Sequence, residues 1–264
     1  MMKTAVEIYK LLPKTNCGKC GLTSCFGFAA KLATGQATPA DCPDMTDAAR
    51  DALGEAGAEH GSPGTVYKQA LEFLRPKVLA LDFRKVASLF GAKLVDPEKL
   101  GLTFLNEDFV VAKEKILDAS GKEPLPWISI LIYNHLCMPD PPEPAGEWIS
   151  FSAIPQSHAK DKAWAGHVED VIANCFSGAL NALKAACEKS GGVVSNVKGG
   201  HDAAYEFHLF PHFPSLLLFY DAVEEEHFPA QCKLLLDRTT PRYLDLESIV
   251  VLGEEFAARL TGLN

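Results

Sequence analysis

The stretch of sequence that decides how this chain is understood is residues 16–25, NCGKCGLTSC, which place Cys17, Cys20 and Cys25 close together. A fourth cysteine, Cys42, follows after sixteen further residues and directly precedes Pro43. Closely spaced thiolates bind neighbouring iron atoms of one cubane cluster, and a distant fourth thiolate completes the cage. Tetrahedral zinc also accepts four thiolates, but structural zinc sites commonly use two Cys-x2-Cys pairs, whereas this motif has one. The spacing therefore favours an iron–sulfur cluster, with zinc as the alternative.

The residues around these cysteines suit an anionic cluster. Gly18 and Gly21 allow the backbone to wrap tightly and to direct N–H groups towards sulfur. A helix is expected from about Ser24 to Thr34, because its apolar residues recur at helical spacing. Cys25 then lies in the first turn, where the helix dipole favours a thiolate. An earlier helix is expected over residues 4–12 and a short one near residues 46–53.

The composition narrows the classes of function. The formal net charge is −9, which argues against binding to nucleic acid or to an anionic membrane, because both bind clustered lysine and arginine. No apolar run approaches the roughly 18 residues of a transmembrane helix, and residues 1–8 lack the apolar core of a signal peptide. We therefore expect a soluble, cytoplasmic protein. In that reducing compartment, clustered cysteines are interpreted as metal ligands rather than as disulfides.

A glycine-rich, weakly apolar stretch at residues 54–64 predicts a linker. It divides the chain into a cluster-binding module, residues 1–57, and a larger domain, residues 58–264. The expected fold class is α+β, a small helical 4Fe–4S module followed by a domain with an antiparallel sheet and helices on one face. The patterns predict helices over 65–75, 82–90, 126–136, 162–189 and 246–260, a hairpin of 102–105 with 109–111, and strands over 205–210, 215–220 and 233–237.

Histidines gather in one region of the larger domain. His208 and His212 flank a strand end, and a neutral imidazole at either position suits the axial site of a cobalt corrinoid or a haem. The alternative is that both are surface or turn residues. The Asp-x-His-x-x-Gly signature of corrinoid binding is absent around His201. No catalytic constellation is assigned, so the sequence leaves open whether the protein is an enzyme.

The remaining cysteines are expected to be structural. Cys175 and Cys187 share the apolar face of the helix expected over 162–189, where both are predicted to be buried. Cys137 lies beside His135 and Met138, so a metal or cofactor site there is an alternative to a structural role.

The amino-terminal motifs resemble a known module. Residues 16–25, followed by Phe28-Ala29, Ala33-Thr34-Gly35 and Cys42-Pro43, are similar to the small 4Fe–4S domain of corrinoid iron–sulfur proteins. The same module occurs in the B subunit of Rnf-type electron-transport complexes. The resemblance covers residues 5–45 and implies one 4Fe–4S cluster. Its ligands would be Cys17, Cys20, Cys25 and Cys42.

The larger domain does not resemble the other domains of those proteins. It resembles a family of anaerobe proteins in which this module precedes a domain of unassigned function. That resemblance rests on residues 146–151, Gly199-Gly200-His201-Asp202, Tyr205, Tyr243-Leu244 and Leu252-Gly253.

Because the module occurs in corrinoid iron–sulfur proteins and Rnf-type complexes, the resemblance implies low-potential electron transfer in anaerobic one-carbon or corrinoid-linked metabolism. The expected partners are a redox protein and a corrinoid protein or methyltransferase system. One alternative is a carrier that binds a corrinoid or another tetrapyrrole and uses the cluster as its reductant. The other is a non-redox interaction protein in which the cluster is structural.

Overall fold

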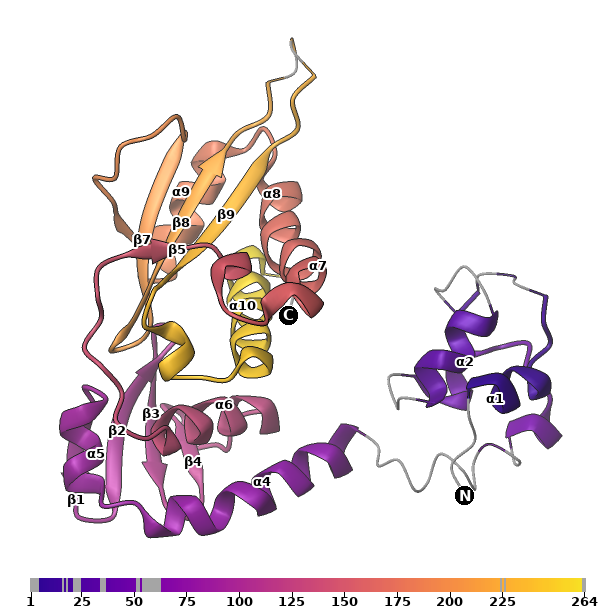
Figure 1. Cartoon of the computed structure of the whole chain (residues 1–264), viewed down its shortest axis with the longest axis horizontal. Coiled ribbons are helices and arrows are strands. Elements are labelled where there is room, and N and C mark those ends of the chain that lie inside the picture. The colour runs from indigo at the N-terminus through magenta and orange to yellow at the C-terminus, as the bar shows by residue number, and fades with distance from the viewer. Residues whose placement is uncertain are drawn as a thin grey trace. The chain divides into compact units, whose positions relative to one another are not determined.

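The computed structural model describes residues 5–15, 17, 19–20, 25–33, 37–50, 53, 63–223, 225 and 227–262. The chain divides into two compact units, Met1–Phe73 and Leu74–Asn264 (Figure 1). The domain boundary expected at residue 57 lies outside the described residues. The α+β class expected from the sequence is confirmed, because a helical amino-terminal unit precedes a unit that contains sheets.

The first unit is built on two short helices, α1 (Ala5–Leu11) and α2 (Cys25–Ala33). Pro13 follows α1 closely and cannot continue it, because proline lacks the N–H that a helix interior requires. The two helices pack together over a small apolar core, and the short 3-10 helix η1 (Pro39–Asp41) follows α2. The buried residues of this core include Ile8, Leu12, Phe28, Ala29, Met45, Ala49 and Leu53.

The second unit contains two antiparallel sheets, of four and five strands, among the residues that the structure describes. The four-stranded sheet has the order β1-β2-β3-β4, so that each strand pairs with the next along the chain. The helix α4 (Pro63–Ala80) contains the boundary between the two units. The elements that follow it are α5 (Phe83–Leu89), β1 (Lys93–Asp96), β2 (Lys99–Phe104), β3 (Glu107–Ala112), β4 (Ile116–Asp118) and α6 (Pro126–Cys137).

The hairpin expected around residues 106–108 is confirmed, with its turn placed one residue earlier. Phe104 pairs with Glu107 across the two strands, so Leu105 and Asn106 form the turn. Both turn residues have positive φ, 48° and 62°, which matches the twist of a two-residue hairpin. The buried Leu105 also donates its N–H to the carbonyl of Leu209, at 3.0 Å. This turn therefore joins the four-stranded sheet to the five-stranded one.

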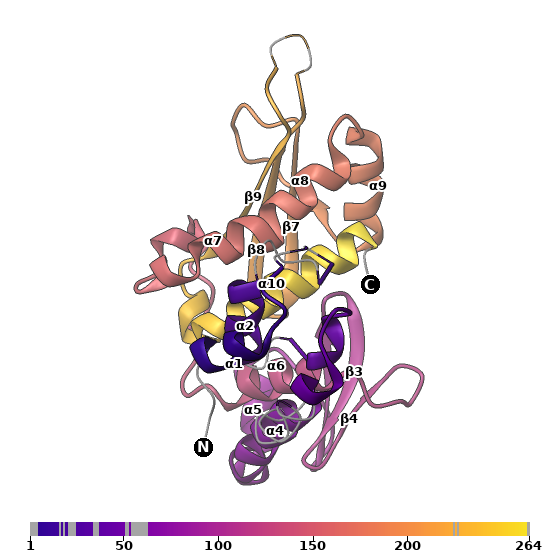
Figure 2. The ribbon, with the colours of Figure 1, turned by 90° about the vertical axis from the view of Figure 1, so that its right-hand side faces the viewer.

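The five-stranded sheet has the order β5-β9-β8-β7-β6, and its helices lie on one face (Figures 1 and 2). Phe207 of this sheet packs edge-on against Phe256 of the last helix, with ring centroids 4.8 Å apart. The strands are β5 (Trp148–Ile149), β6 (Val193–Val194), β7 (Ala203–Phe210), β8 (Phe213–Tyr220) and β9 (Gln231–Asp237). The helical segments are η2 (Phe151–Ala153), η3 (Ser157–Ala159), α7 (Asp161–Trp164), η4 (Ala165–Glu169), α8 (Asp170–Phe176), α9 (Leu180–Lys189), η6 (Thr240–Arg242) and α10 (Leu246–Thr261).

The single helix expected over residues 162–189 is wrong, because the chain interrupts it twice. The segment η4 is a π-helix, which shifts the faces of the helix, and the helix ends at Phe176. Gly178 then adopts φ +69° and donates its N–H to Asp221 Oδ1 at 2.7 Å. As a result Cys175 is exposed while Cys187 is buried, so the two do not share a face.

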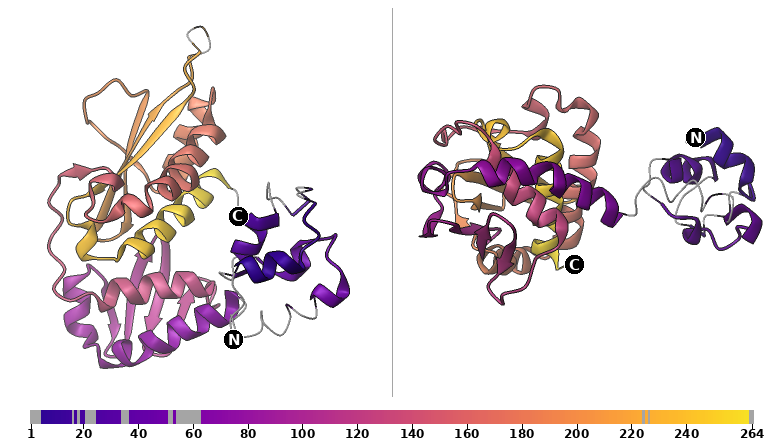
Figure 3. Two further views of the ribbon diagram at one scale, coloured as in Figure 1. Left: turned by 45° about the vertical axis from the view of Figure 1, so that its right-hand side comes forward. Right: turned by 90° about the horizontal axis from the view of Figure 1, so that it is seen from below.

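The carboxyl-terminal helix matches its expectation closely. Asp245 caps α10 by accepting a hydrogen bond from the backbone N–H of Ser248 at 2.9 Å, as an N-cap aspartate does. Farther along α10, Glu255 accepts from Trp127 Nε1 at 2.9 Å and binds Arg259. These bonds attach α10 to α6, and Figure 3 shows both sheets from two further directions.

Candidate metal centre

The four amino-terminal cysteines all lie in the first unit. Cys25 is the first residue of α2, and Cys42 directly follows η1. Both are buried in the apolar core, and Cys20 packs against the same core. Cys17 is exposed. All eight cysteines of the chain are among the described residues, and each is a thiol rather than half of a disulfide.

The thiols influence one another electrostatically. Burial raises the pKa of Cys42, and the nearby sulfur atoms of Cys20, Cys25 and Cys17 raise it further, while a backbone hydrogen bond at Asp44 opposes them. Placing several thiolates together is unfavourable because their charges repel. Bound iron would offset that repulsion, because its positive charge stabilises the deprotonated thiols that coordinate it. A cationic centre would therefore stabilise these neighbouring thiols more than it would stabilise four thiols that lie far apart.

Two cations and one carboxylate hold the cysteine-bearing segments. Arg50 donates from Nη2 to the Cys42 carbonyl at 2.7 Å and from Nε to the Met45 carbonyl at 3.3 Å. Lys19, which lies between Cys17 and Cys20, forms an ion pair with Asp44 at 2.9 Å. This bond lowers the pKa of Asp44, and Cys17 also hydrogen-bonds to the same carboxylate. The loop of the first two cysteines is thereby attached to the segment that follows the fourth.

The donor set fits an iron–sulfur cluster. Among the described residues, no three His, Cys, Asp or Glu side chains enclose a position for a single metal ion. Four thiols, of which two are buried in an apolar core, suit a 4Fe–4S cluster, because cysteine thiolates are the ligands of such a cluster.

The structure places His208 and His212 at the β7–β8 turn, outside the first unit. His208 is exposed, and its Nδ1 lies 3.1 Å from the carbonyl oxygen of Pro211. A carbonyl oxygen only accepts, so Nδ1–H donates and a neutral ring keeps its lone pair on Nε2. His212 makes the same kind of bond to the Leu89 carbonyl at 3.2 Å, but its Nε2 faces Gly91, where an added Cβ would lie only 2.9 Å away. His208 is therefore the more accessible of the two as a metal ligand.

A third histidine, His135, is the one that the structure singles out. Its side chain is fully buried, and neither ring nitrogen has a hydrogen-bond partner. The ring stacks on Phe210 at 4.0 Å and contacts Phe90 edge-on at 4.8 Å. Burial, with a contribution from His212, lowers the pKa of His135 to about 3. In the sequence, only the apolar character of the helix that carries His135 indicates that the ring is buried.

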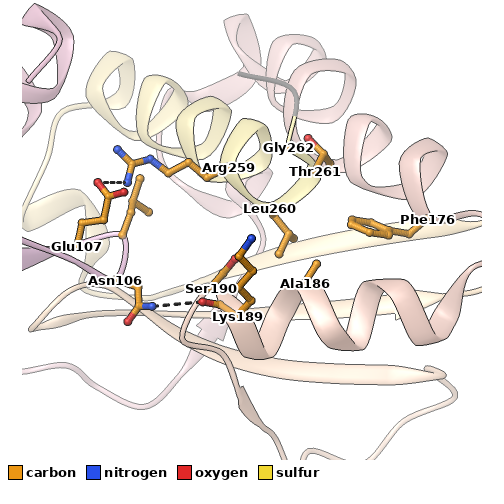
Figure 4. A pocket seen from close by; sticks show the side chains of 11 residues that line it. Asn106, Glu107, Phe176, Ala186, Lys189, Ser190, Arg259, Leu260, Thr261 and Gly262 are labelled. Carbon is orange, nitrogen blue, oxygen red and sulfur yellow. Dashed lines mark hydrogen bonds and ion pairs between the residues drawn. The ribbon is translucent and has the colours of Figure 1, made fainter.

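A groove of about 520 Å³ opens where the β2–β3 turn meets the carboxyl-terminal ends of α9 and α10 (Figure 4). On one side Arg259 forms ion pairs with Glu107 and Glu255, both at 2.8 Å. On the other, Asn106 Nδ2 donates to the Lys189 carbonyl at 3.5 Å. A smaller cavity of about 130 Å³ shares Asn106 with this groove and is lined in part by His208. Motif searching missed this site because its residues come from four distant segments.

A helical unit with four interacting thiols, followed by an α+β unit, defines a two-part iron–sulfur protein with a 4Fe–4S module at its amino-terminal end. Residues 12–43 match the family described as "Putative Fe-S cluster". Residues 82–259 match the family described as "Domain of unknown function (DUF3786)". Because this second match spans more than half of the chain, the protein belongs to that family.

The module is similar to part of several larger proteins. The corrinoid/iron-sulfur protein large subunit of Moorella thermoacetica is 53% identical over 58 residues, which are 22% of this chain and 13% of that protein. The acetyl-CoA decarbonylase/synthase complex subunit gamma of Methanothermobacter thermautotrophicus is 35% identical over 97 residues, 31% of this chain and 21% of the relative. The chain therefore spans less than a quarter of the length of these relatives. No solved structure matches the chain.

The comparisons confirm the resemblance to the 4Fe–4S module of corrinoid iron–sulfur proteins that residues 16–43 indicated. None of the helices in the described ranges combines the length and the apolar character needed to cross a bilayer.

Proposed function

We propose that this protein transfers single electrons through a 4Fe–4S cluster bound by Cys17, Cys20, Cys25 and Cys42. The observation that carries the proposal is that Cys25 and Cys42 are buried in one small apolar core and that Cys20 packs against the same core. Cys17 is linked to this region by its hydrogen bond to Asp44, which lies two residues after Cys42. The match of residues 12–43 to an iron–sulfur family supports the same assignment.

The exposure of the site supports electron transfer over a purely structural cluster. Cys17 is exposed and Cys20 is partly buried, so one side of the centre lies near the surface. The other two cysteines are held in the apolar core, which excludes water from the opposite side. Solvent exposure and hydrogen bonds to sulfur tune the reduction potential of such clusters.

The relatives suggest the metabolic setting. Their names place the module in corrinoid/iron-sulfur and acetyl-CoA decarbonylase/synthase proteins. We place this protein in anaerobic one-carbon metabolism in the cytoplasm, with a corrinoid protein or methyltransferase system as the electron acceptor. Cobalt in such systems is active in a low-valent state, so cobalt that has been oxidised accidentally must be reduced again by an electron donor.

Redox titration of the anaerobically purified full chain tests the electron-transfer role. We expect a broad absorbance at about 400 nm that bleaches on reduction and returns on reoxidation over repeated cycles. Loss of the absorbance after one cycle, or irreversible unfolding on reduction, would instead indicate a cluster that serves only to stabilise the module.

A second candidate function has support from His208. A metal-binding histidine commonly donates its other ring N–H to a carbonyl, and His208 does so to Pro211. His208 lines a cavity of about 130 Å³. This cavity shares Asn106 with the groove of about 520 Å³, a volume within the range of cofactor pockets, roughly 300–1,000 Å³. The second unit would then carry a corrinoid or another tetrapyrrole, with the cluster as reductant. Equilibrium dialysis against cobalamin tests this, and the His208→Ala variant should lose any binding seen.

A further inference from the structure

An exposed aromatic ring that packs against a partly buried one lies on the helix that begins at Cys25. Phe26 directly follows Cys25 on α2, and its side chain is 49% exposed, whereas Phe28 on the same helix is 1% exposed. Tyr9 of α1 contacts the edge of the Phe26 ring, with centroids 5.6 Å apart. The contact fixes the orientation of Phe26 without burying it. An ordered and exposed aromatic ring is the type of residue that protein interfaces place at their centre.

Lysines accompany this pair of rings. Lys14 Nζ lies 5.7 Å from the centroid of the Tyr9 ring, within the range of a cation–π interaction. Residues 5–33 contain four lysines and one acidic residue, although the chain as a whole has a net charge of −9. The lysines are Lys10, Lys14, Lys19 and Lys31, and the acid is Glu7. Lys19 is paired with Asp44, and the other three lysines still outnumber the one acidic residue, so residues 5–33 are locally basic within an acidic protein.

We propose that Tyr9, Lys14 and Phe26, here called the Tyr9–Phe26 face, dock a small acidic electron-carrier protein. This inference rests on the proposed electron-transfer function. In the docked complex one electron passes from the reduced carrier to the oxidised cluster, so the carrier is oxidised and the cluster is reduced by the same amount. The aromatic centre supplies contact area, and the surrounding lysines steer an acidic partner into place.

Position explains why this face is suited to the task. Phe26 directly follows Cys25 in α2, so a partner that contacts its ring lies against the same helix turn that carries this proposed cluster ligand. A rival explanation for the lysines is that they offset the negative charge of a thiolate-bound cluster. That explanation predicts a change in reduction potential when the lysines are reversed, and it assigns no role to Phe26.

The test measures electron transfer from a reduced plant-type 2Fe–2S ferredoxin to the full chain by stopped flow. The variants are Phe26→Ser and the double reversal Lys10→Glu with Lys14→Glu. Matched controls are Phe228→Ser, which removes another exposed phenylalanine, and Lys85→Glu with Lys198→Glu in the second unit. Reduction by dithionite and the midpoint potential are recorded for every variant.

We expect the lysine reversal to lower the second-order rate at low salt tenfold or more, with the difference shrinking as salt rises. Phe26→Ser should lower the rate several-fold at all salt concentrations, and both controls should match the unmodified protein. Unchanged rates in both test variants, no transfer from ferredoxin, or rate losses explained by a shifted potential would overturn the docking proposal. If dithionite itself fails to reduce the cluster reversibly, the proposed function fails first, and the two failures are thus distinguishable.

Discussion

Replacing His135 should reduce the acid sensitivity of the second unit. The imidazole is fully buried between Phe210 and Phe90, and its two nitrogens have no partner to share a charge. Its pKa is lowered from 6.5 to about 3. The unfolded chain therefore binds a proton between these pH values that the folded chain excludes. The stabilisation from keeping this ring neutral is complete above pH 6.5 and is lost as the pH falls towards 3.

The magnitude follows from linkage between protonation and folding. Each pH unit below the unfolded pKa costs about 1.4 kcal/mol for one excluded proton. Between pH 8 and pH 5, His135 thus accounts for about 2 kcal/mol of lost stability. In a His135→Leu variant we expect the difference in unfolding free energy between these two pH values to shrink by about that amount. A loss of packing in the variant lowers the unfolding free energy by the same amount at both pH values, so it does not change the difference between them.

Urea unfolding followed by tryptophan fluorescence provides the assay. Trp127, Trp148 and Trp164 are the three tryptophans of the chain, and all lie in the second unit. His158→Gln is the control, because its side chain is 89% exposed and has no burial to lose. If His135→Leu keeps the full pH dependence of the unmodified protein, the burial argument for this histidine is wrong.

Two further predictions concern packing and loop attachment. In Gly253→Ala the new Cβ would lie 2.6 Å from Trp164 Cζ3. We therefore expect the free energy of unfolding in urea to fall by about 1–3 kcal/mol. The control Gly166→Ala has open space around it and should be neutral or slightly stabilising. Burial raises the pKa of Asp237, but hydrogen bonds from Thr239 and from two loop N–H groups outweigh burial, so the pKa is lowered. The stabilisation of the fold by ionised Asp237 is therefore present above the ordinary carboxyl pKa and is lost in acid. Asp237→Asn should cost about 1–3 kcal/mol at pH 7, and an equal stability of variant and unmodified protein there would contradict this account.

The metal centre could be expected from sequence because ligand spacing is a local property. Cys17, Cys20 and Cys25 lie within nine residues of sequence, and Cys42 follows one helix later, so the spacing of the ligands can be recognised without knowledge of distant segments. The cap that Asp245 forms on α10 is local in the same way, since it bonds to a backbone N–H of the first turn.

Features that depend on distant segments were not predictable in this way. Leu105 adopts a positive φ that leucine disfavours, and what holds it is burial and a bond to Leu209 in another sheet. The interruption of the helix at Gly178 depends on Asp221, more than 40 residues away. His135 is unremarkable in sequence, and its significance arises only when Phe210 covers it.

Iron and acid-labile sulfide analysis of the anaerobically purified full chain, combined with EPR of the reduced protein, tests the central claim most directly. The account predicts four iron atoms and four sulfides per chain, with an EPR signal of a reduced 4Fe–4S cluster. A Cys42→Ser variant should lose most of that iron, while Cys175→Ser should retain it, because Cys175 is an exposed thiol in the second unit. A colourless protein that contains one zinc ion per chain and no sulfide would contradict the account.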